Sequence, residues 1–323
     1  MKRLDSIDAL PQRLRFVLAI GMFDGVHRGH RRVIAALRRA ATRYDAKPVL
    51  LTFDPHPAQL LRGSAPPLVC DTAERLALLA REGVDTVVVQ PFDHAFADQA
   101  PEAFLERLCS GRQLQALVMT AESAFRRDRA GGLTAIGRLA PQLGFHVIEV
   151  SRLATHGSTV SSTGLRSLLA DGRLAAVRRL LGRDYAVVGR VVRGDGRGRD
   201  LGYPTANLAF DAPVALPPDG IYAVRVGCGG RNLLEPDRRA DGAASLGVRP
   251  TFADGGARIL EVNLFGLNED LYGRRLRVEF VRRLRGEKRF ANAAALIRQM
   301  GRDVARARMV LRSNRTTVRL RRN

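Results

Sequence analysis

The chain has 323 residues, of which 46% are hydrophobic, so it is long enough to form two domains with a core in each. Its three cysteines are widely spaced without a CxxC pair, which argues against a disulfide framework and a cysteine zinc site. A formal charge of +21 suits nucleic-acid binding, but only 6% of residues are aromatic and nearly all the positive charge is arginine, a skew typical of coding bias.

The first half alternates short apolar runs with segments of helical spacing. The runs 16–20, 48–53, 85–90, 116–120 and 145–150 are apolar throughout, as strands covered on both faces should be. Between them, 30–44, 72–83 and 101–109 repeat apolar residues at helical spacing. The alternation predicts right-handed crossovers and a parallel sheet, in an α/β, Rossmann-like domain over residues 1–183.

The turn after the first run, GMFDGVHRGH (21–30), places His27 and His30 at the start of a predicted helix. A zinc site would need a further donor, and only scattered candidates such as His56 exist. A loop that enters a helix gathers backbone N–H groups and the positive end of the helix dipole, which favours phosphate binding. The alternative is that the histidines merely cap the helix.

A second anion site is predicted at TVSSTGLRSLLADGRL (159–174). Ser161 or Ser162 is placed to cap a helix whose first turns carry Arg166. Two hydroxyls and a guanidinium can bind phosphate oxygens, although this pattern taken alone favours a simple N-cap.

Together, a strand, G-x-F-D-G-V-H-x-G-H and later S-S-T-x-x-R resemble the HxGH-type nucleotidyltransferases. With LTFDPHPAQLL and VSSTGLRSLLADGRLAAVRRLLGRDY, the first half is similar to the adenylyltransferase half of the prokaryotic bifunctional riboflavin kinase/FMN adenylyltransferase (FAD synthetase) family. This resemblance implies transfer of AMP from ATP to the phosphate of FMN, with FAD and pyrophosphate as products. Because that acceptor is already anionic, alignment and charge neutralisation can suffice without a general base.

The resemblance also implies roles for individual residues in this half. His27 and His30 would hold the ATP phosphates through the transition state. Ser161, Ser162 and Arg166 would bind the departing pyrophosphate. The other residues expected to contact ATP are Phe23, Asp24, Gly25 and Gly29.

One segment departs from the family pattern G-x-(D/N)-F-x-F-G. Here TAESAFRRDRAG (120–131) has Thr120 and Arg126 at the glycine positions, Glu122 at the acidic position and Ser123 in place of an aromatic residue. These changes should alter the flavin and nucleotide pocket, so they suggest an alternative in which this half is a diverged or inactive nucleotidyltransferase.

The pattern changes after residue 183. The runs 186–194, 220–227, 243–248, 259–267 and 275–284 are separated by Gly, Pro and Asp turns, which predicts an antiparallel sheet or small β-barrel over 184–311. One amphipathic helix within 292–311 carries an apolar stripe, and residues 312–323 are expected to form a loose basic tail.

The stretch VVGRVVRGDGRGRDLGYPTANLAF (187–210) closely resembles the riboflavin kinase module. Its glycine-rich turn can fold N–H groups round phosphates, although a glycine cluster alone is as often a hairpin turn. The resemblance implies that Gly194, Gly198 and Arg199 contact ATP. Thr205 and Asn207 are alternate residues with oxygen ligands, suitable for Mg²⁺ shared with ATP.

Phosphorylation of riboflavin requires a base for the ribityl hydroxyl. Glu261 lies between apolar Leu260 and Val262 in a predicted strand, and this pattern alone favours an ordinary solvent-facing residue. Its match to the family's E-V-x-L strand, followed by L-Y-G, implies that Glu261 is the general base. The resemblance places the following residues on the flavin or nucleotide side: Arg249, Thr251 and Phe252 of SLGVRPTF, and Arg285 and Glu287 of LRGEKRF.

Three hypotheses follow: a bifunctional enzyme that makes FMN and FAD, a riboflavin kinase with a diverged first half, and a basic nucleic-acid-binding or regulatory protein on the same folds. The expected small molecules are riboflavin, FMN, FAD, ATP and Mg²⁺. No apolar run is long enough to cross a bilayer and the first fifteen residues lack the apolar centre of a secretion signal. We therefore expect a cytoplasmic protein without membrane or specific nucleic-acid partners, and oligomerisation is compatible with the sequence.

Overall fold

A computed structural model describes residues 1–121, 132–155, 158–230, 233–248, 258–267 and 269–320. The chain divides by packing into two compact units. The sheet unit comprises Met1–Pro66 and Arg75–Ser162, and the barrel unit comprises Pro67–Glu74 and Thr163–Asn323. The barrel unit thus takes eight residues from within the first half, which the sequence pattern does not reveal.

The sheet unit is built on six parallel strands in the order β1-β4-β3-β2-β5-β6. The chain moves outward from the central strand β2 and then returns to its other side at β5, which makes the carboxyl ends of these strands a topological switch point. The predicted parallel sheet is confirmed, and β1 extends it by one edge strand. The strands are β1 (Lys2–Leu4), β2 (Arg15–Ile20), β3 (Lys47–Asp54), β4 (Thr86–Pro91), β5 (Gln113–Met119) and β6 (His146–Glu149).

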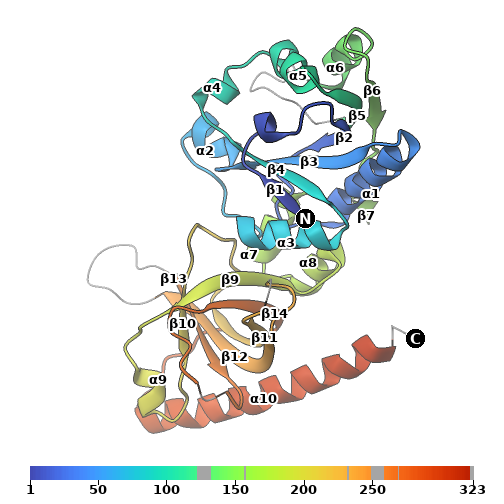
Figure 1. Cartoon of the computed structure of the whole chain (residues 1–323). Helices are drawn as coiled ribbons and strands as arrows, with labels where there is room; N and C mark the ends of the chain where they lie inside the picture. The colour runs from blue at the N-terminus through green and yellow to red at the C-terminus, as the bar shows by residue number, and fades with distance from the viewer. Residues whose placement is uncertain (122–131, 156–157, 231–232, 249–257, 268, 321–323) are drawn as a thin grey trace. The chain divides into compact units, whose positions relative to one another are not determined.

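Helices join and cover these strands (Figure 1). α1 packs on β2, β3 and β5, because its buried residues Ile34, Leu37 and Ala41 share one face. α5 and α6 contribute Phe104, Leu108 and Ile136 to a core with the strand residues. The helices are α1 (Arg28–Arg43), α2 (Pro57–Arg62), α3 (Thr72–Arg81), α4 (His94–Ala97), α5 (Pro101–Cys109) and α6 (Leu133–Leu139), with a 3-10 turn η1 (Ile7–Ala9) and the short pair β7 (Ala154–Thr155) and β8 (Ser158–Thr159).

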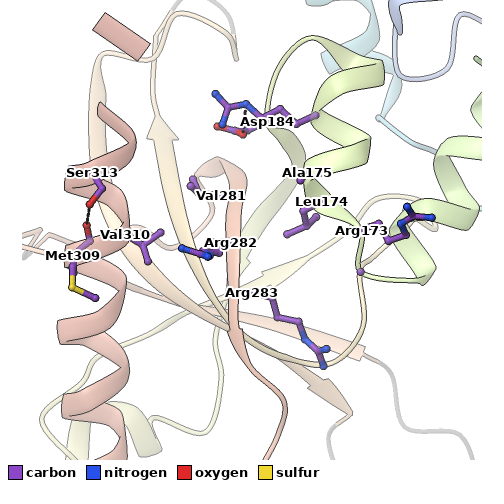
Figure 2. Close-up of a pocket in the computed structure, with 12 residues that line it drawn as sticks. Arg173, Leu174, Ala175, Asp184, Val281, Arg282, Arg283, Met309, Val310 and Ser313 are labelled. Carbon is purple, nitrogen blue, oxygen red and sulfur yellow. Dashed lines mark hydrogen bonds and ion pairs between the residues drawn. The ribbon is translucent and has the colours of Figure 1, made fainter. Parts of the chain in front are cut away.

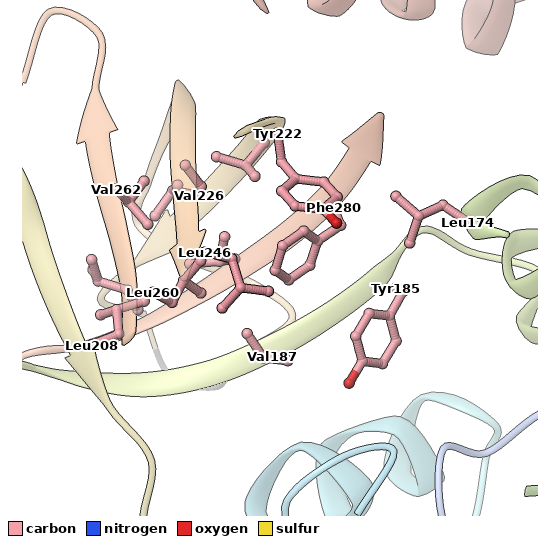
Figure 3. Close-up of a cluster of buried hydrophobic side chains, with 14 of the residues drawn as sticks. Leu174, Tyr185, Val187, Leu208, Tyr222, Val226, Leu246, Leu260, Val262 and Phe280 are labelled. Carbon is pink, nitrogen blue, oxygen red and sulfur yellow. The ribbon is translucent and has the colours of Figure 1, made fainter. Parts of the chain in front are cut away.

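The barrel unit contains a closed antiparallel barrel in the order β10-β13-β12-β11-β14-β9. Alternate residues point inward, and Figure 3 shows Tyr222, Leu246, Leu260, Val262 and Phe280 within this core. Closure leaves no open sheet edge, as the sequence predicted for a small barrel. The strands are β9 (Tyr185–Val192), β10 (Ala206–Ala209), β11 (Gly220–Cys228), β12 (Arg238–Val248), β13 (Arg258–Leu264) and β14 (Arg275–Arg285).

The described residues of this part of the chain also form the helices α7 (Ser162–Ala170), α8 (Leu174–Leu181), the short α9 (Arg197–Asp200) and α10 (Ala293–Leu320). α10 runs along the barrel and packs on β11, β12 and β14, with Ala307 and Leu311 buried (Figure 1). The expected loose tail from residue 312 is wrong in its first part, since the helix continues to Leu320. No glycine or proline interrupts residues 312–320, so nothing local ends the helix there.

The segment Pro67–Glu74, here called the strap, is held to the barrel by backbone and side-chain contacts. The Leu68 N–H donates to the Pro213 carbonyl at 2.9 Å, and Val69 is buried in the barrel core. The Arg277 Nε donates to Glu74 at 2.9 Å. Because both side chains of this ion pair are almost fully buried, the strap is an integral part of the barrel unit.

Candidate functional site

The loop between β2 and α1 is a tight turn at the switch point of the sheet. Phe23, Gly25 and Val26 all have positive φ angles, a backbone conformation that residues other than glycine seldom adopt. Such strain persists only where surrounding contacts hold it, and it is frequent at functional sites. Gly29 packs closely as well, because a Cβ there would meet the His27 ring at 3.1 Å.

His27 and His30 lie together at the start of α1. Their rings stack with centroids 3.6 Å apart, and the His27 Nδ1 accepts the His30 backbone N–H at 3.2 Å. His27 is therefore the N-cap of α1, so the capping interpretation is confirmed for this nitrogen. This geometry leaves the helix N-terminus and two adjacent imidazoles beside the loop, the combination predicted for phosphate binding.

Three polar side chains of the sheet unit hold the loop in place. The Thr52 Oγ1 and the Arg75 Nη1 donate to the Met22 carbonyl at 3.1 and 3.2 Å, and the Ser162 Oγ donates to the Asp24 carbonyl at 3.0 Å. Arg75 is 1% exposed and also donates to the Phe53 carbonyl at 3.1 Å. Sequence reasoning missed Arg75, because an arginine in a helical pattern is normally solvated.

The predicted pyrophosphate residues divide between the two units. Ser162 begins α7 and contacts the loop, as described above, and Ser161 precedes it. Arg166 belongs to the barrel unit, where its Nε donates to the Pro67 carbonyl at 2.8 Å. Its role toward pyrophosphate stays a prediction. The segment 120–131 differs from the family pattern in sequence, and its residues 122–131 lie outside the described part of the chain.

The barrel unit brings the predicted kinase residues together on the outer face of the barrel. Glu261 lies opposite Asn207 on one side and Ser245 on the other, in the β10–β13 and β12–β13 registers. Directly opposed residues in antiparallel strands point to the same face, with Cβ atoms about 5 Å apart. Leu260 and Val262 fill the core, so Glu261 points outward, as its sequence neighbours predicted.

A cavity of about 510 Å³ opens on this face between the barrel and α10. Thr205 and Glu261 line it together with Arg285 and Glu287, the two residues expected to contact flavin. Arg199 is exposed and is not among the described residues that line this cavity. Arg249, Thr251 and Phe252 lie outside the described residues. Apolar side chains of α10 form the opposite wall: Leu296, Met300 and Val304.

Asn207 is held where it could contribute to a cation site. Its side chain is nearly buried, and its Oδ1 has no hydrogen-bond partner among the described residues. A Cβ on Gly194 would lie 2.3 Å from the Asn207 Nδ2, so a larger residue there would displace this amide. A Cβ on Gly198 would lie 2.5 Å from the Tyr203 carbonyl oxygen, so this loop is also closely packed. A second cavity of about 720 Å³ adjoins Asn207.

Two further residues support this site. Asn263 donates from Nδ2 to the Pro204 carbonyl at 2.8 Å and so ties β13 to the residue before Thr205. Asp303 of α10 accepts Arg285 at 3.0 Å from Nε and 2.7 Å from Nη2, which fixes the guanidinium in the cavity wall. Sequence reasoning missed both. A signal for Asp303 exists, since it is the sole carboxylate of an arginine-rich helix.

Comparison with known proteins shows which family has this arrangement. A family profile described as FAD synthetase matches residues 11–164, and one described as riboflavin kinase matches residues 181–311. The bifunctional riboflavin kinase/FMN adenylyltransferase of Escherichia coli (strain K12) is 36% identical over 90% of this chain and 91% of its own length. The chain belongs to this family.

Other bifunctional riboflavin kinase/FMN adenylyltransferases are similar over nearly the whole chain. The Pseudomonas fluorescens protein is 35% identical over 92% of this chain and 94% of its own. The Bacillus subtilis protein is 29% identical over 90% and 91%. The family resemblance inferred from the sequence motifs is thus confirmed, and both halves of the family are present.

The fold is similar to that of a solved structure as well. A crystal structure described as a macrolide-efflux protein from Streptococcus pneumoniae matches 94% of this chain and 96% of its own, with a TM-score of 0.81 and 28% identity. None of the helices in the described ranges combines the length and apolar character needed to cross a bilayer.

Proposed function

We propose that the two reactions of the family are divided between the two units. The barrel unit phosphorylates riboflavin to FMN with ATP, and the sheet unit transfers AMP from ATP to FMN with release of pyrophosphate. The observation that supports the kinase assignment is the pairing of Asn207 with Glu261 in adjacent strands on the outer barrel face, where Glu261 lines the first cavity and Asn207 the second. The family membership supports both activities over a nucleic-acid-binding or regulatory protein.

In the barrel unit, riboflavin would occupy the cavity between the barrel and α10. Its volume of about 510 Å³ lies within the usual range for small-molecule sites, and Leu296, Met300 and Val304 offer apolar contact to a flat ring. The Arg285 guanidinium, held by Asp303, and the Glu287 carboxylate would orient its polar edge. The ATP phosphates would lie along Gly194, Gly198 and Arg199.

The residues present fit a magnesium ion. Asn207 offers a buried amide oxygen without a hydrogen-bond partner in the described ranges, and the Thr205 hydroxyl lies at the neighbouring cavity. Mg²⁺ prefers such oxygen ligands together with phosphate oxygens and would neutralise charge on the ATP phosphates. Thr205 and Asn207 would therefore hold it.

Glu261 would accept the proton of the ribityl hydroxyl as that oxygen attacks the γ-phosphate of ATP. The P–O bond to ADP breaks as the new ester bond forms, so the products are FMN and ADP with the proton left on the carboxylate. In the sheet unit, the phosphate of FMN attacks the α-phosphate of ATP and pyrophosphate leaves. There, His27, His30 and the amino end of α1 would stabilise the negative charge on the triphosphate.

Two single variants test this division. Glu261→Gln should lower the rate of riboflavin phosphorylation by about 10²-fold or more, because general-base catalysis typically contributes this much, and should leave FMN adenylylation intact. His30→Ala should have the opposite effect, because His30 lies at the phosphate loop of the other unit. Both rates are measured by chromatographic separation of riboflavin, FMN and FAD with ATP and Mg²⁺.

The wild-type chain provides the control for both variants. FMN that accumulates without FAD in the wild type would contradict the adenylyltransferase assignment and favour a riboflavin kinase with a diverged first half. A Glu261→Gln variant that phosphorylates riboflavin at the wild-type rate would contradict the role of Glu261.

A further inference from the structure

The face of α10 that points away from the barrel carries a row of arginines. Arg298, Arg302, Arg306 and Arg312 are all exposed, and their spacing places them along one side of the helix. Arg312 follows Arg298 by fourteen positions, so the row spans about 21 Å at the usual helical rise. Met309, which is 63% exposed, lies among them.

These four positive charges are not neutralised within the barrel unit. None of the four has an acidic partner among the residues that the structure describes. Asp303 is the only carboxylate of α10, and it is buried and already paired with Arg285. A row of unpaired guanidinium groups at this spacing creates a local positive potential beyond that of the chain as a whole.

A groove beside α10 extends this basic surface. The groove is about 700 Å³ and lies between the start of α8, the end of β14 and α10 (Figure 2). Arg173 and Arg282 line it, are exposed, and have no acidic partner in the described ranges. Arg178 also lines it but is paired with Asp184 at 3.4 Å.

The side of α10 that faces the barrel already makes contacts within the barrel unit. Ala307 and Leu311 are buried against the barrel. Leu296 and Met300 line the proposed flavin cavity between the barrel and α10. α10 therefore has no continuous apolar face left to enter a bilayer, as an interfacial membrane helix needs. A partner for the exposed face must instead be recognised by its negative charge, over a length comparable to the arginine row.

We propose that this basic surface, defined as Arg173, Arg282, Arg298, Arg302, Arg306 and Arg312, binds the phosphodiester backbone of nucleic acid. Guanidinium groups form paired hydrogen bonds with phosphate oxygens. No aromatic side chain belongs to the surface, so it contacts the backbone without stacking on bases and does not read sequence. This interaction is separate from the two reactions, because the side of α10 that lines the proposed flavin cavity carries Leu296, Met300 and Val304 and none of these arginines.

The test compares two variants that remove equal charge. In the surface variant, Arg298, Arg302, Arg306 and Arg312 are each replaced by Gln. In the control variant, the same change is made at four exposed arginines of the sheet unit: Arg32, Arg39, Arg62 and Arg81. Binding of the full-length chain to a labelled RNA of about 20 nucleotides and to duplex DNA is measured by fluorescence anisotropy over a range of salt concentrations.

We expect the surface variant to bind RNA at least about tenfold more weakly than the control variant at moderate salt. Its slope of log K against log salt should be smaller by about 3 for single strands, since each lost phosphate contact removes about 0.7. Riboflavin phosphorylation should match the wild-type rate in both variants, which shows that the barrel unit is folded.

Two results would overturn the proposal. An equal loss of affinity in both variants would mean that binding follows the total charge of the chain and not this surface. Tighter association with vesicles that contain anionic lipid than with RNA at the same salt, abolished in the surface variant, would assign the surface to membranes.

Discussion

The kinase site depends on two glycines that sequence reasoning assigned to phosphate and that the structure also packs against functional side chains. Gly194 faces the Asn207 amide, and a Cβ added to Gly194 would lie 2.3 Å from the Asn207 Nδ2. Gly198 lies close to Thr205. Real Cβ atoms do not tolerate such distances, so the loop and the proposed cation ligands constrain one another.

We expect Gly194→Ala to displace Asn207 and weaken the proposed Mg²⁺ site. The riboflavin kinase reaction should need about tenfold more Mg²⁺ for half-maximal rate, because one oxygen ligand is misplaced. Gly137→Ala is a matched control, since its Cβ would meet nothing and it lies in α6 of the sheet unit. A Mg²⁺ titration of FMN formation that is unchanged in Gly194→Ala would contradict the proposed ligand.

Asp184 makes the stability of the barrel unit dependent on pH. Burial raises the pKa of its carboxyl, although Arg178 and Arg225 partly counteract this. A carboxyl with a raised pKa favours the folded state in its protonated form. This contribution is complete below the unfolded pKa of about 3.9 and is lost as pH rises through the folded pKa.

Asp184→Asn should therefore remove this pH dependence. Between pH 4 and 7, the difference in free energy of unfolding between the variant and the wild type should shift progressively in favour of the variant. Urea denaturation at several pH values measures it. A difference that shifts in the opposite direction would show that Arg178 and Arg225 outweigh the effect of burial and hold the Asp184 carboxylate charged.

At the level of elements, the strap Pro67–Glu74 packs in the barrel unit, although the rest of that unit begins only at Thr163. Its apolar residue Val69 resembles any buried residue of the first half, so periodicity does not distinguish it. Glu74 and Arg277 are separated by 203 residues and form an ion pair in which both side chains are nearly buried. Only the folded chain reveals this pairing.

We expect Glu74→Ala to destabilise the barrel unit by about 3 kcal/mol, because the buried Arg277 loses one of its two carboxylate partners and keeps only Glu279. Asp71→Ala is the matched control from the same strap. Its partner Arg275 is about one-third exposed, and Asp71 also accepts the Glu74 backbone N–H at 2.6 Å, so the loss should be smaller, about 1–2 kcal/mol. The loss of stability is followed through tyrosine fluorescence, since four of the five tyrosines lie in the barrel unit and only Tyr44 lies in the sheet unit. Equal effects of the two substitutions would contradict the importance of burial.

At the level of the whole molecule, the excess of arginine is a physical property whatever its origin. A formal charge of +21 repels itself and opposes the compact state. The ion pairs at the surface are too exposed to compensate for this repulsion.

We therefore expect the melting temperature to rise by several degrees between about 10 and 200 mM NaCl, as the Debye length falls from about 30 Å to below 10 Å. Differential scanning fluorimetry measures this, and a neutral osmolyte at matched osmolarity is the control. A melting temperature that falls with salt would mean that attractive surface pairs outweigh the repulsion.

The sequence alone determined the elements and their chemistry, because these depend on local patterns. Apolar runs predicted the strands, and GMFDGVHRGH and GDGRGRDLGYPTAN indicated two phosphate sites and a family. The alternation around Glu261 predicted that it points away from the core, and the register of β13 confirms this.

Only the tertiary structure shows which residues from separate segments lie next to one another. It placed Asn207 opposite Glu261, Asp303 against Arg285, and the strap on the barrel. It also showed that α10 continues past residue 312 and turns an arginine row to solvent. These features depend on strand register and on packing between segments that lie 18 to 203 residues apart in the sequence, and local patterns do not specify which segments pair.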